Sequence, residues 1–408
     1  MLVDKSHLTY CTNIHSGETW TEHFAALKTS FPEIKNQVSP DKQMGIGLRL
    51  SHIASLELSK AENLREFQQW LNEHSAYVFT MNGFPYGGFH DTRVKDQVHA
   101  PDWTTHERVD YTIRLFNILK ELLPNGVDGG ISTSPLSYRH WFGKSSDELL
   151  NVRQIATLNI LKVVEQLILI KHEKLQVLHL DIEPEPDGIL ETGIEFIEWF
   201  ENELLPAGIS MITEKFGFTF SEAEVILKNH VRLCYDVCHF AIGYEPHKEI
   251  IHQLELRGIK IGKIQISAAI KAQLTSDIKQ RELLFAAFSG FNEQTYLHQV
   301  VARRSDGAYI RYRDLPEALV DINNLEVEEW RAHFHVPIFV EQFDVLYSTQ
   351  NDIFEVLKIQ NSKQLTTHLE VETYTWEVLP ENLKIPLQDS IVRELKWVNE
   401  NFFQKDYL

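Results

Sequence analysis

Acidic and amide side chains end four successive apolar runs in the second half of the chain. The runs cover residues 175–184, 231–240, 262–269 and 367–376, and they supply Glu183, Asp236, Gln265 and Glu372. Ionised carboxylates held close together repel one another unless a cation or a proton neutralises them. Three carboxylates and one amide oxygen form a hard, oxygen-rich ligand set, which favours Mn²⁺ or Mg²⁺. The sequence therefore predicts a divalent metal site at these four residues.

Three histidines could add imidazole ligands to this site. His239 follows Asp236 by three residues, and His333 and His335 alternate along a predicted strand, so that both imidazoles point the same way. A histidine ligand would make Zn²⁺ possible. The pair at 333 and 335 predicts a second metal site or a substrate clamp. The alternative is that all three are structural, held by hydrogen bonds or partly exposed.

Polar residues near the ends of several runs are candidates for contact with a substrate. We select His15, Arg49, Asn82, His239, Lys263 and His335. Arg49 and Lys263 favour an anionic ligand, unless they pair with Asp181 or Glu370 instead. The glycine-rich, aromatic loop 83–90 has the composition of a lid over a polar ligand, and a plain connecting loop is the alternative.

Eight short apolar runs must position these side chains. Besides the four already given, they cover 8–15, 44–51, 76–83 and 129–137. Segments of helical period follow them at 20–31, 63–74, 106–124, 148–170, 193–206 and 249–258. Repeated strand–helix units with buried strands indicate a parallel sheet, and eight of them favour a closed (β/α)8 barrel over an open doubly wound sheet. In such a barrel the strand ends meet at one mouth.

One barrel domain can account for the whole chain, residues 1–408. The stretch 270–366 is too long for one strand–helix unit, so we predict a helical insertion between the seventh and eighth strands. Within it, residues 333–340 read as one further strand.

The composition excludes several classes of function. The chain has 39 basic and 58 acidic residues and a formal charge of -19, which opposes binding to nucleic acid. It has only three cysteines, its start lacks the profile of a secretory signal, and no run is long enough to span a bilayer. We therefore expect a soluble cytoplasmic protein that acts on a small metabolite and does not insert into a membrane.

The phrases LDIEP, YDVCH, KIQIS and LEVET, in this order, resemble the xylose-isomerase-like superfamily of sugar isomerases, ketose epimerases and apurinic endonucleases. The resemblance implies a TIM barrel with the metal on Glu183, Asp236, Gln265 and Glu372, where Gln265 stands in place of the usual histidine. It also implies that Glu183 and Glu372 exchange protons with the substrate. The longer phrases HLTYCTNIHSGETW, FTMNGFPYGGFH and VETYTWEVLP are similar to the EboE family, described as metabolite traffic proteins of bacterial gene clusters.

Four functions are compatible with these residues. The first is a metal-dependent isomerase or epimerase of a sugar-like metabolite, with Glu183 and Glu372 as the acid–base pair. The second is a non-catalytic protein that binds or hands over a metabolite. The third is a metal-dependent lyase or hydrolase. An apurinic endonuclease is the least favoured, because the third and fourth runs end without histidine and the net charge opposes DNA.

Overall fold

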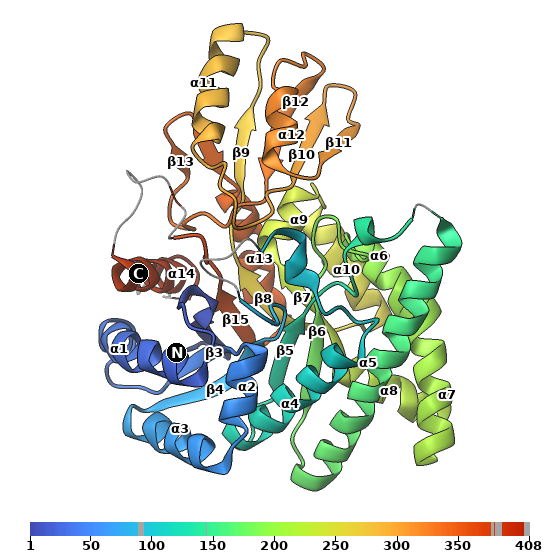
Figure 1. Cartoon of the computed structure of the whole chain (residues 1–408). Helices are drawn as coiled ribbons and strands as arrows, with labels where there is room; N and C mark the ends of the chain where they lie inside the picture. The colour runs from blue at the N-terminus through green and yellow to red at the C-terminus, as the bar shows by residue number, and fades with distance from the viewer. Residues whose placement is uncertain (89–93, 144, 377–378, 380–385, 404–408) are drawn as a thin grey trace.

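Eight parallel strands form a closed barrel in the computed structural model (Figure 1). The structure describes every residue except 89–93, 144, 377–378, 380–385 and 404–408. Around the barrel the strands are β2 (Ser6–Tyr10), β3 (Met44–Arg49), β4 (Ala76–Asn82), β5 (Gly129–Thr133), β6 (Leu178–Ile182), β7 (Val231–Asp236), β8 (Ile261–Ile266) and β15 (His368–Val371). A parallel bridge between Cys11 and Gly47 joins β2 to β3. The predicted (β/α)8 barrel is therefore confirmed.

The contact between β2 and β3, which closes the barrel, depends on the absence of a side chain at Gly47. A Cβ atom there would collide with the Glu370 carboxylate and lie 2.8 Å from the backbone oxygen of Tyr10. Next to it, the hydroxyl of Thr9 donates a hydrogen bond to the backbone oxygen of Gly45 at 2.8 Å. A glycine thus lets the first two barrel strands approach closely around a buried polar side chain.

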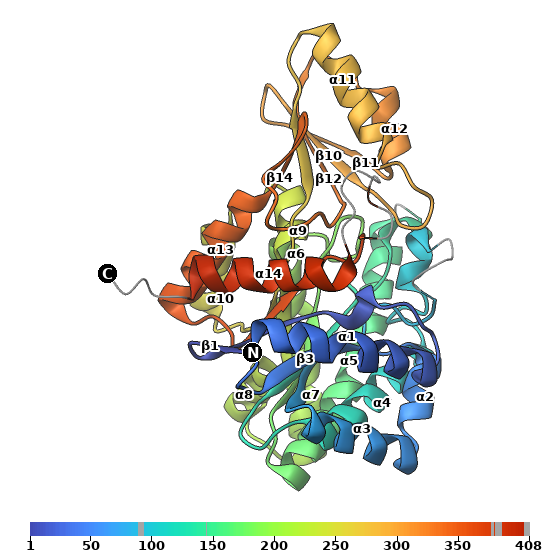
Figure 2. The same cartoon turned by 90° about the vertical axis from the view of Figure 1, so that its left-hand side faces the viewer.

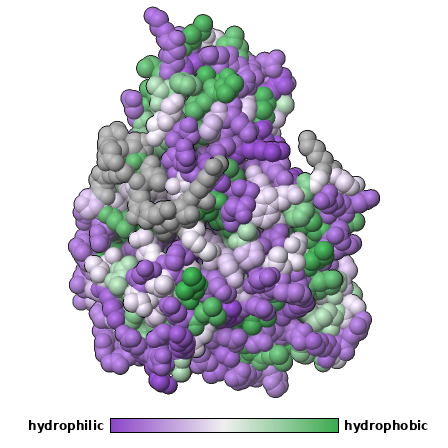
Figure 3. Space-filling view, viewed as in Figure 1, coloured by the Kyte–Doolittle hydropathy of each residue, from purple (hydrophilic) through white to green (hydrophobic). Residues whose placement is uncertain are grey.

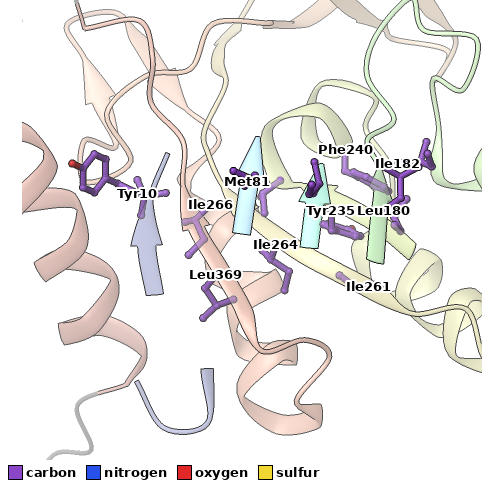
Figure 4. Close-up of a cluster of buried hydrophobic side chains, with 14 of the residues drawn as sticks. Tyr10, Met81, Leu180, Ile182, Tyr235, Phe240, Ile261, Ile264, Ile266 and Leu369 are labelled. Carbon is purple, nitrogen blue, oxygen red and sulfur yellow. The ribbon is translucent and has the colours of Figure 1, made fainter. Parts of the chain in front are cut away.

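Side chains along each strand alternate between the barrel interior and the surrounding helices. Figure 4 shows the apolar set, which includes Leu180, Ile182, Ile264, Ile266 and Leu369. The residues between them along the strands are polar, and in the β7–β8–β15 register Asp236, Gln265 and Glu370 lie side by side. The strand pattern that builds the core therefore also turns the polar side chains inward.

Helices cover the outside of the barrel (Figures 1 and 2). They are α1 (Trp20–Val38), α2 (His52–Leu58), α3 (Ala61–Glu73), α4 (His106–Leu122), α5 (Ser146–Lys174), α6 (Gly193–Trp199), α7 (Leu205–Phe216), α8 (Phe220–His230), α10 (His247–Arg257), α13 (Gln350–Lys363) and α14 (Leu387–Phe402). The short, fully buried helix α9 (Val237–Ile242) instead follows β7 directly at the C-terminal end of that strand. Capping boxes at Thr19–Glu22, Thr192–Glu195 and Thr219–Glu222 fix the starts of α1, α6 and α8. The short strand β1 (Leu2–Val3) pairs antiparallel with β2.

Helix α1 is longer than its sequence pattern predicts. The predicted helix stops at Phe31, in front of Pro32, whereas the observed helix continues through Pro32 to Val38. The buried side chains Phe24, Leu27, Phe31 and Ile34 form one continuous apolar face. Packing of this face outweighs the hydrogen bond that proline cannot donate.

A second sheet lies over the C-terminal ends of the barrel strands (Figure 1). Its residues come between β8 and β15 in the sequence. Its six antiparallel strands have the order β11-β10-β12-β9-β14-β13. They are β9 (Ile270–Gln273), β10 (Val300–Arg304), β11 (Tyr309–Tyr312), β12 (Val327–Ala332), β13 (Gln342–Phe343) and β14 (Leu346–Ser348). Two helices, α11 (Ile278–Ser289) and α12 (Leu315–Val320), belong to the same segment.

The prediction that this segment is helical is wrong, and so is the strand predicted at 333–340. Short β-branched and aromatic runs separated by Asp306-Gly307 form the hairpin of β10 and β11, a turn signal present in the sequence. Residues 333–340 instead follow β12 as an irregular segment. Contacts with the barrel hold this segment, among them the hydrogen bond from the Val336 backbone N–H to the oxygen of Ala268 at 3.0 Å.

Within the described residues, no helix combines the length and the apolar character needed to cross a membrane. The face drawn in Figure 3 is mainly hydrophilic, with hydrophobic residues in small scattered groups. This distribution agrees with the formal charge of -19.

Glu394 on α14 is buried beside the barrel, and we expect its ionisation to make the free energy of unfolding depend on pH. Its Oε1 atom accepts hydrogen bonds from the hydroxyl of Thr373 at 2.7 Å and the backbone N–H of Ile338 at 3.2 Å. Burial nevertheless raises the pKa of Glu394 to about 8. Because the folded-state pKa exceeds that of the unfolded chain, the contribution of Glu394 is greatest at low pH and falls as the pH rises through 8.

The variant Glu394→Gln tests this effect. Between pH 6 and pH 8 the wild type is expected to lose on the order of 2 kcal/mol of unfolding free energy more than the variant, because only the wild type must ionise a buried group. Urea unfolding at both pH values measures the difference. Parallel losses in the two proteins would show that Glu394 ionises without cost.

Candidate metal centre

Three carboxylates meet at the mouth of the barrel. Glu183 follows β6, Asp236 ends β7 and Glu372 follows β15, and one oxygen of each lies within 4.8 Å of the others. All three side chains are buried, with at most 4% exposed. Strands β7 and β8 separate β6 from β15, so Glu183 and Glu372 approach from different sides of the mouth. The predicted convergence of these three residues is therefore present in the structure.

Two oxygens of this cluster fit a bound cation. Among the described residues, Glu183 Oε2 and Asp236 Oδ2 have no hydrogen-bond partner. The other Asp236 oxygen accepts hydrogen bonds from the backbone N–H of His239 at 3.0 Å and the hydroxyl of Ser267 at 2.8 Å. Leaving buried charged oxygens without a partner is costly. A divalent cation between these carboxylates would satisfy both oxygens.

Glu372 is held by three amide groups. Its Oε1 atom accepts from Asn13 Nδ2 and Asn82 Nδ2, each at 2.8 Å, and its Oε2 atom accepts from Gln265 Nε2. A carboxylate offers about four lone-pair positions. One position on Oε2 thus remains for a cation, and the amides fix the orientation of the carboxylate.

The electrostatics of the cluster favour a proton or a cation. Burial, followed by repulsion from Glu372 and Asp236, raises the pKa of Glu183 well above its ordinary value. Burial, with repulsion from Asp236 and Glu370, likewise raises the pKa of Glu372, although Lys263 and the Asn13 hydrogen bond oppose the rise. The carboxylates would therefore be stabilised by a shared proton or cation.

Gln265 lies in the cluster but presents its nitrogen to Glu372. Its Oε1 atom accepts a hydrogen bond from the buried thiol of Cys234 at 2.6 Å. As a metal ligand Gln265 would have to rotate its amide so that the oxygen faces the cation. Its predicted ligand role remains a hypothesis, and in this arrangement it orients Glu372.

Lys263 lies inside the barrel and is neutralised there. Its ammonium group forms a salt bridge with Glu370 and donates to Ser132 Oγ at 3.0 Å, and neither ion-pair partner has an exposed side chain. Burial alone would lower the pKa of Lys263, but Glu370 raises it above its ordinary value. Of the two alternatives for Lys263, pairing with Glu370 is the one that the structure contains.

A cavity opens beside the carboxylates, and it contains three of the six predicted substrate contacts. Asn82, His239 and His335 line it together with Glu183 and Glu372. The other three, His15, Arg49 and Lys263, are not among the described residues that line the cavity. Arg49 donates to the backbone oxygen of Gly87 and pairs with Glu18 at 3.2 Å, while His15 contacts the hydroxyl of Tyr10 at 3.1 Å. Their substrate-binding role stays a prediction without geometric support.

The cavity also has walls that lie outside the strand ends of the barrel. Phe84 and Pro85 of the glycine-rich loop line it, whereas Phe89 and His90 of that loop lie outside the described residues. The connection between β4 and α4 adds His99, which pairs with Glu185 at 2.8 Å. Residues next to strands of the second sheet add His333, which follows β12, and Gln299, which precedes β10. Gln299 and His99 belong to no strand end of the barrel, so the pattern used to collect candidates could not find them.

Comparison with known proteins identifies similar folds. No family model and no curated protein matches the chain, so the EboE resemblance stays a prediction. One similar structure is that of 3-keto-D-glucoside 4-epimerase from E. coli, with 13% identity, a TM-score of 0.45 and coverage of 97% of this chain and 99% of that chain. Another is that of D-psicose 3-epimerase with D-fructose, with 9% identity, a TM-score of 0.47 and coverage of 97% and 98%.

A third is a structure of the IolI protein with a zinc atom, with 14% identity, a TM-score of 0.44 and coverage of 98% of this chain and 100% of that chain. These similarities are weak. The barrel assignment therefore rests on the strand order and the closing bridge of this chain.

Proposed function

We propose that this protein is a metal-dependent isomerase or epimerase of a small, polar, sugar-like metabolite. The observation that carries the proposal is the convergence of Glu183, Asp236 and Glu372 with two unpartnered buried oxygens beside a cavity. Mn²⁺ or Mg²⁺ suits these oxygen ligands best. When bound, the cation would polarise a carbonyl or hydroxyl oxygen of the substrate.

The carboxylates would then move the proton. Glu183 lines the cavity, and its second oxygen, which would not hold the cation, would accept a proton from the carbon next to the polarised oxygen. Glu372 approaches from the other side of the mouth and would return a proton to the substrate. Asn13, Asn82 and Gln265 keep the Glu372 carboxylate oriented during both transfers.

The polar wall of the cavity supports a substrate rich in hydroxyl groups. Lys95, His99 and Gln299 line it together with the carboxylates. Such groups donate and accept hydrogen bonds at several positions, as binding of a polyol or sugar requires. The substrate would thus be held by side chains from both the barrel and the second sheet.

One observation favours a second candidate function, a non-catalytic protein that binds or hands over a metabolite. Three amide donors already engage Glu372 and occupy three of its about four lone-pair positions, which leaves little room for it to exchange a proton with a substrate. The resemblance to EboE proteins would link either function to the production or traffic of a secondary metabolite. Bound metal without proton exchange on any sugar would favour this second function.

Metal binding by the variant Asp236→Asn tests the shared premise of both functions. The substitution keeps the shape of the side chain and removes one charged ligand, so the affinity for Mn²⁺ is expected to fall at least about tenfold. Titration of metal-free protein followed by electron paramagnetic resonance of free Mn²⁺ measures the affinity.

Asp102→Asn is the matched control. Asp102 is buried and accepts hydrogen bonds from Ser137 and Thr104, and it does not line the described cavity. Its replacement should leave Mn²⁺ affinity unchanged. Equal affinities of the wild type and Asp236→Asn would remove Asp236 from the proposed ligand set.

A further inference from the structure

Three buried histidines bring their Nε2 atoms together beside the carboxylates. His239 lies in α9, directly after β7, whereas His333 and His335 belong to the irregular segment after β12 of the second sheet. His333 Nε2 lies 3.2 Å from His239 Nε2 and 3.3 Å from His335 Nε2. All three side chains line the cavity. The cluster thus joins the barrel to the second sheet at the cavity.

The other ring nitrogens of these histidines fix the tautomers. His239 Nδ1 faces the backbone oxygen of Pro184 at 3.0 Å, and His335 Nδ1 faces that of Glu372 at 2.8 Å. A carbonyl oxygen can only accept a hydrogen bond, so both Nδ1 atoms must carry the proton. Whenever these rings are neutral, their Nε2 atoms therefore present lone pairs.

His333 has the same tautomer because of Gln299. Its Nδ1 atom lies 2.8 Å from Gln299 Oε1, and Gln299 Nε2 donates to the backbone oxygen of Pro186 at 3.0 Å. The Pro186 oxygen accepts only, which fixes the amide with its oxygen toward His333. His333 Nδ1 is hence the donor, and its Nε2 lone pair faces those of His239 and His335.

The lone pair on His333 Nε2 repels those on its two neighbours unless a cation or a proton lies between them. Among the residues that the structure describes, the only hydrogen-bonding neighbours of these Nε2 atoms are one another. Nitrogens bound to a tetrahedral zinc at about 2.0–2.1 Å lie about 3.3 Å apart. The two separations around His333 match this ligand-to-ligand spacing.

We propose that His239, His333 and His335 form a second divalent-cation site, distinct from the carboxylate site and suited to Zn²⁺ or a similar transition metal. Neutral imidazoles prefer such metals over Mg²⁺. Three histidine ligands leave a fourth position open, and all three side chains line the cavity. The Nδ1 contacts with Pro184, Gln299 and Glu372 provide the outer hydrogen bonds typical of histidine ligands.

Asp236 connects the two sites. It belongs to the carboxylate group and also lies within 4.8 Å of nitrogens of His239 and His335. Two cations would therefore be neighbours at the cavity, one on carboxylates and one on imidazoles. This second site stands on its own geometry and does not depend on the proposed isomerase activity.

Spectroscopy of Co²⁺ and Mn²⁺ in the full-length protein tests the proposal. Tetrahedral Co²⁺ with imidazole ligands absorbs visible light strongly, whereas Mn²⁺ reports on the oxygen-rich site through paramagnetic resonance. Metal-free wild type is expected to gain the Co²⁺ band at one equivalent. His333→Gln is expected to lower Co²⁺ affinity at least about 100-fold, because it removes a ligand. Loss of a hydrogen-bond partner of a ligand costs about 10- to 100-fold. The Mn²⁺ affinity of His333→Gln should stay within about threefold, which also shows that the variant is folded.

Two further variants sharpen the test. Gln299→Leu removes the acceptor for His333 Nδ1 and should weaken Co²⁺ binding about 10- to 100-fold, whereas Gln299→Glu keeps an acceptor and should not. His230→Gln is the matched control, because His230 is also buried and bonded through Nδ1 to a backbone oxygen, that of Leu178 at 2.6 Å, outside the cavity. It should leave the Co²⁺ band unchanged.

Each failure has a distinct outcome. Absence of a tetrahedral Co²⁺ band in the wild type, or its persistence in His333→Gln, would overturn the three-histidine site. If Mn²⁺ still bound at the carboxylates, the proposed isomerase would survive that result. Conversely, a Co²⁺ band without any Mn²⁺ binding would support the second site and contradict the proposed function.

Discussion

Replacement of Glu183 by glutamine is expected to reduce exchange of a substrate hydrogen with solvent by about 10²- to 10⁴-fold, the range for loss of a general base. The glutamine side chain has nearly the shape of glutamate but cannot accept the proton. Glu183 and Glu372 both line the cavity, but three amides already engage Glu372. Incorporation of deuterium from D₂O into a panel of ketoses and aldoses, followed by mass spectrometry, measures the rate.

The measurement is made at Mn²⁺ concentrations that saturate both proteins, because Glu183 is also a proposed ligand. Equal metal occupancy then separates the loss of a base from the loss of the cation. Glu245→Gln is the control, since Glu245 accepts a hydrogen bond from the backbone N–H of Gly193 at 2.8 Å and does not line the described cavity. A wild-type rate in Glu183→Gln with full metal occupancy would exclude Glu183 as the base.

Replacement of Lys263 by methionine is expected to lower the free energy of unfolding by about 3–5 kcal/mol, the usual cost of removing one partner of a buried ion pair. The variant leaves the Glu370 carboxylate inside the barrel without its cation, and Glu370 Oε1 already lacks a partner among the described residues. Methionine retains most of the length and apolar surface of the lysine side chain. Urea unfolding at pH 7 measures the loss.

The double variant Lys263→Met, Glu370→Gln separates charge from packing. Once both charges are absent, much of the lost stability should return, because a buried ion pair costs desolvation of both partners. A single variant that loses less than about 1 kcal/mol would indicate that Glu370 takes up a proton at little cost. In that case Lys263 would not be needed to hold the interior charge.

The sequence was sufficient to predict the barrel, because each strand carries its own local signal. All eight predicted runs contain the observed strands or overlap them, and glycines or prolines mark the ends of many helices. The second sheet was missed because its strands are short and pair across long connections, as β9 does with β12. Such pairing depends on tertiary contacts, which periodicity within a short window does not contain.

The convergence of the three carboxylates could also be predicted from their positions at strand ends, because all eight ends meet at one mouth. The same reasoning could not show that Lys263 lies outside the cavity lining. The alternation along a strand predicts that a side chain points inward, but it predicts neither its depth in the barrel nor its partner. Lys263 and Glu370 come from neighbouring strands and neutralise each other below the mouth. The histidine cluster was only partly anticipated, because His333 and His335 reach His239 from a segment with no strand of its own.

The central claim is that Glu183, Asp236 and Glu372 bind a divalent cation. Anomalous diffraction from crystals of metal-free protein soaked in Mn²⁺, recorded on both sides of the manganese absorption edge, tests it most directly. We predict an anomalous peak at coordination distance from one oxygen of each of the three carboxylates. No peak between them at saturating Mn²⁺, with the unpartnered oxygens of Glu183 and Asp236 hydrogen-bonded to water or protonated instead, would contradict the claim.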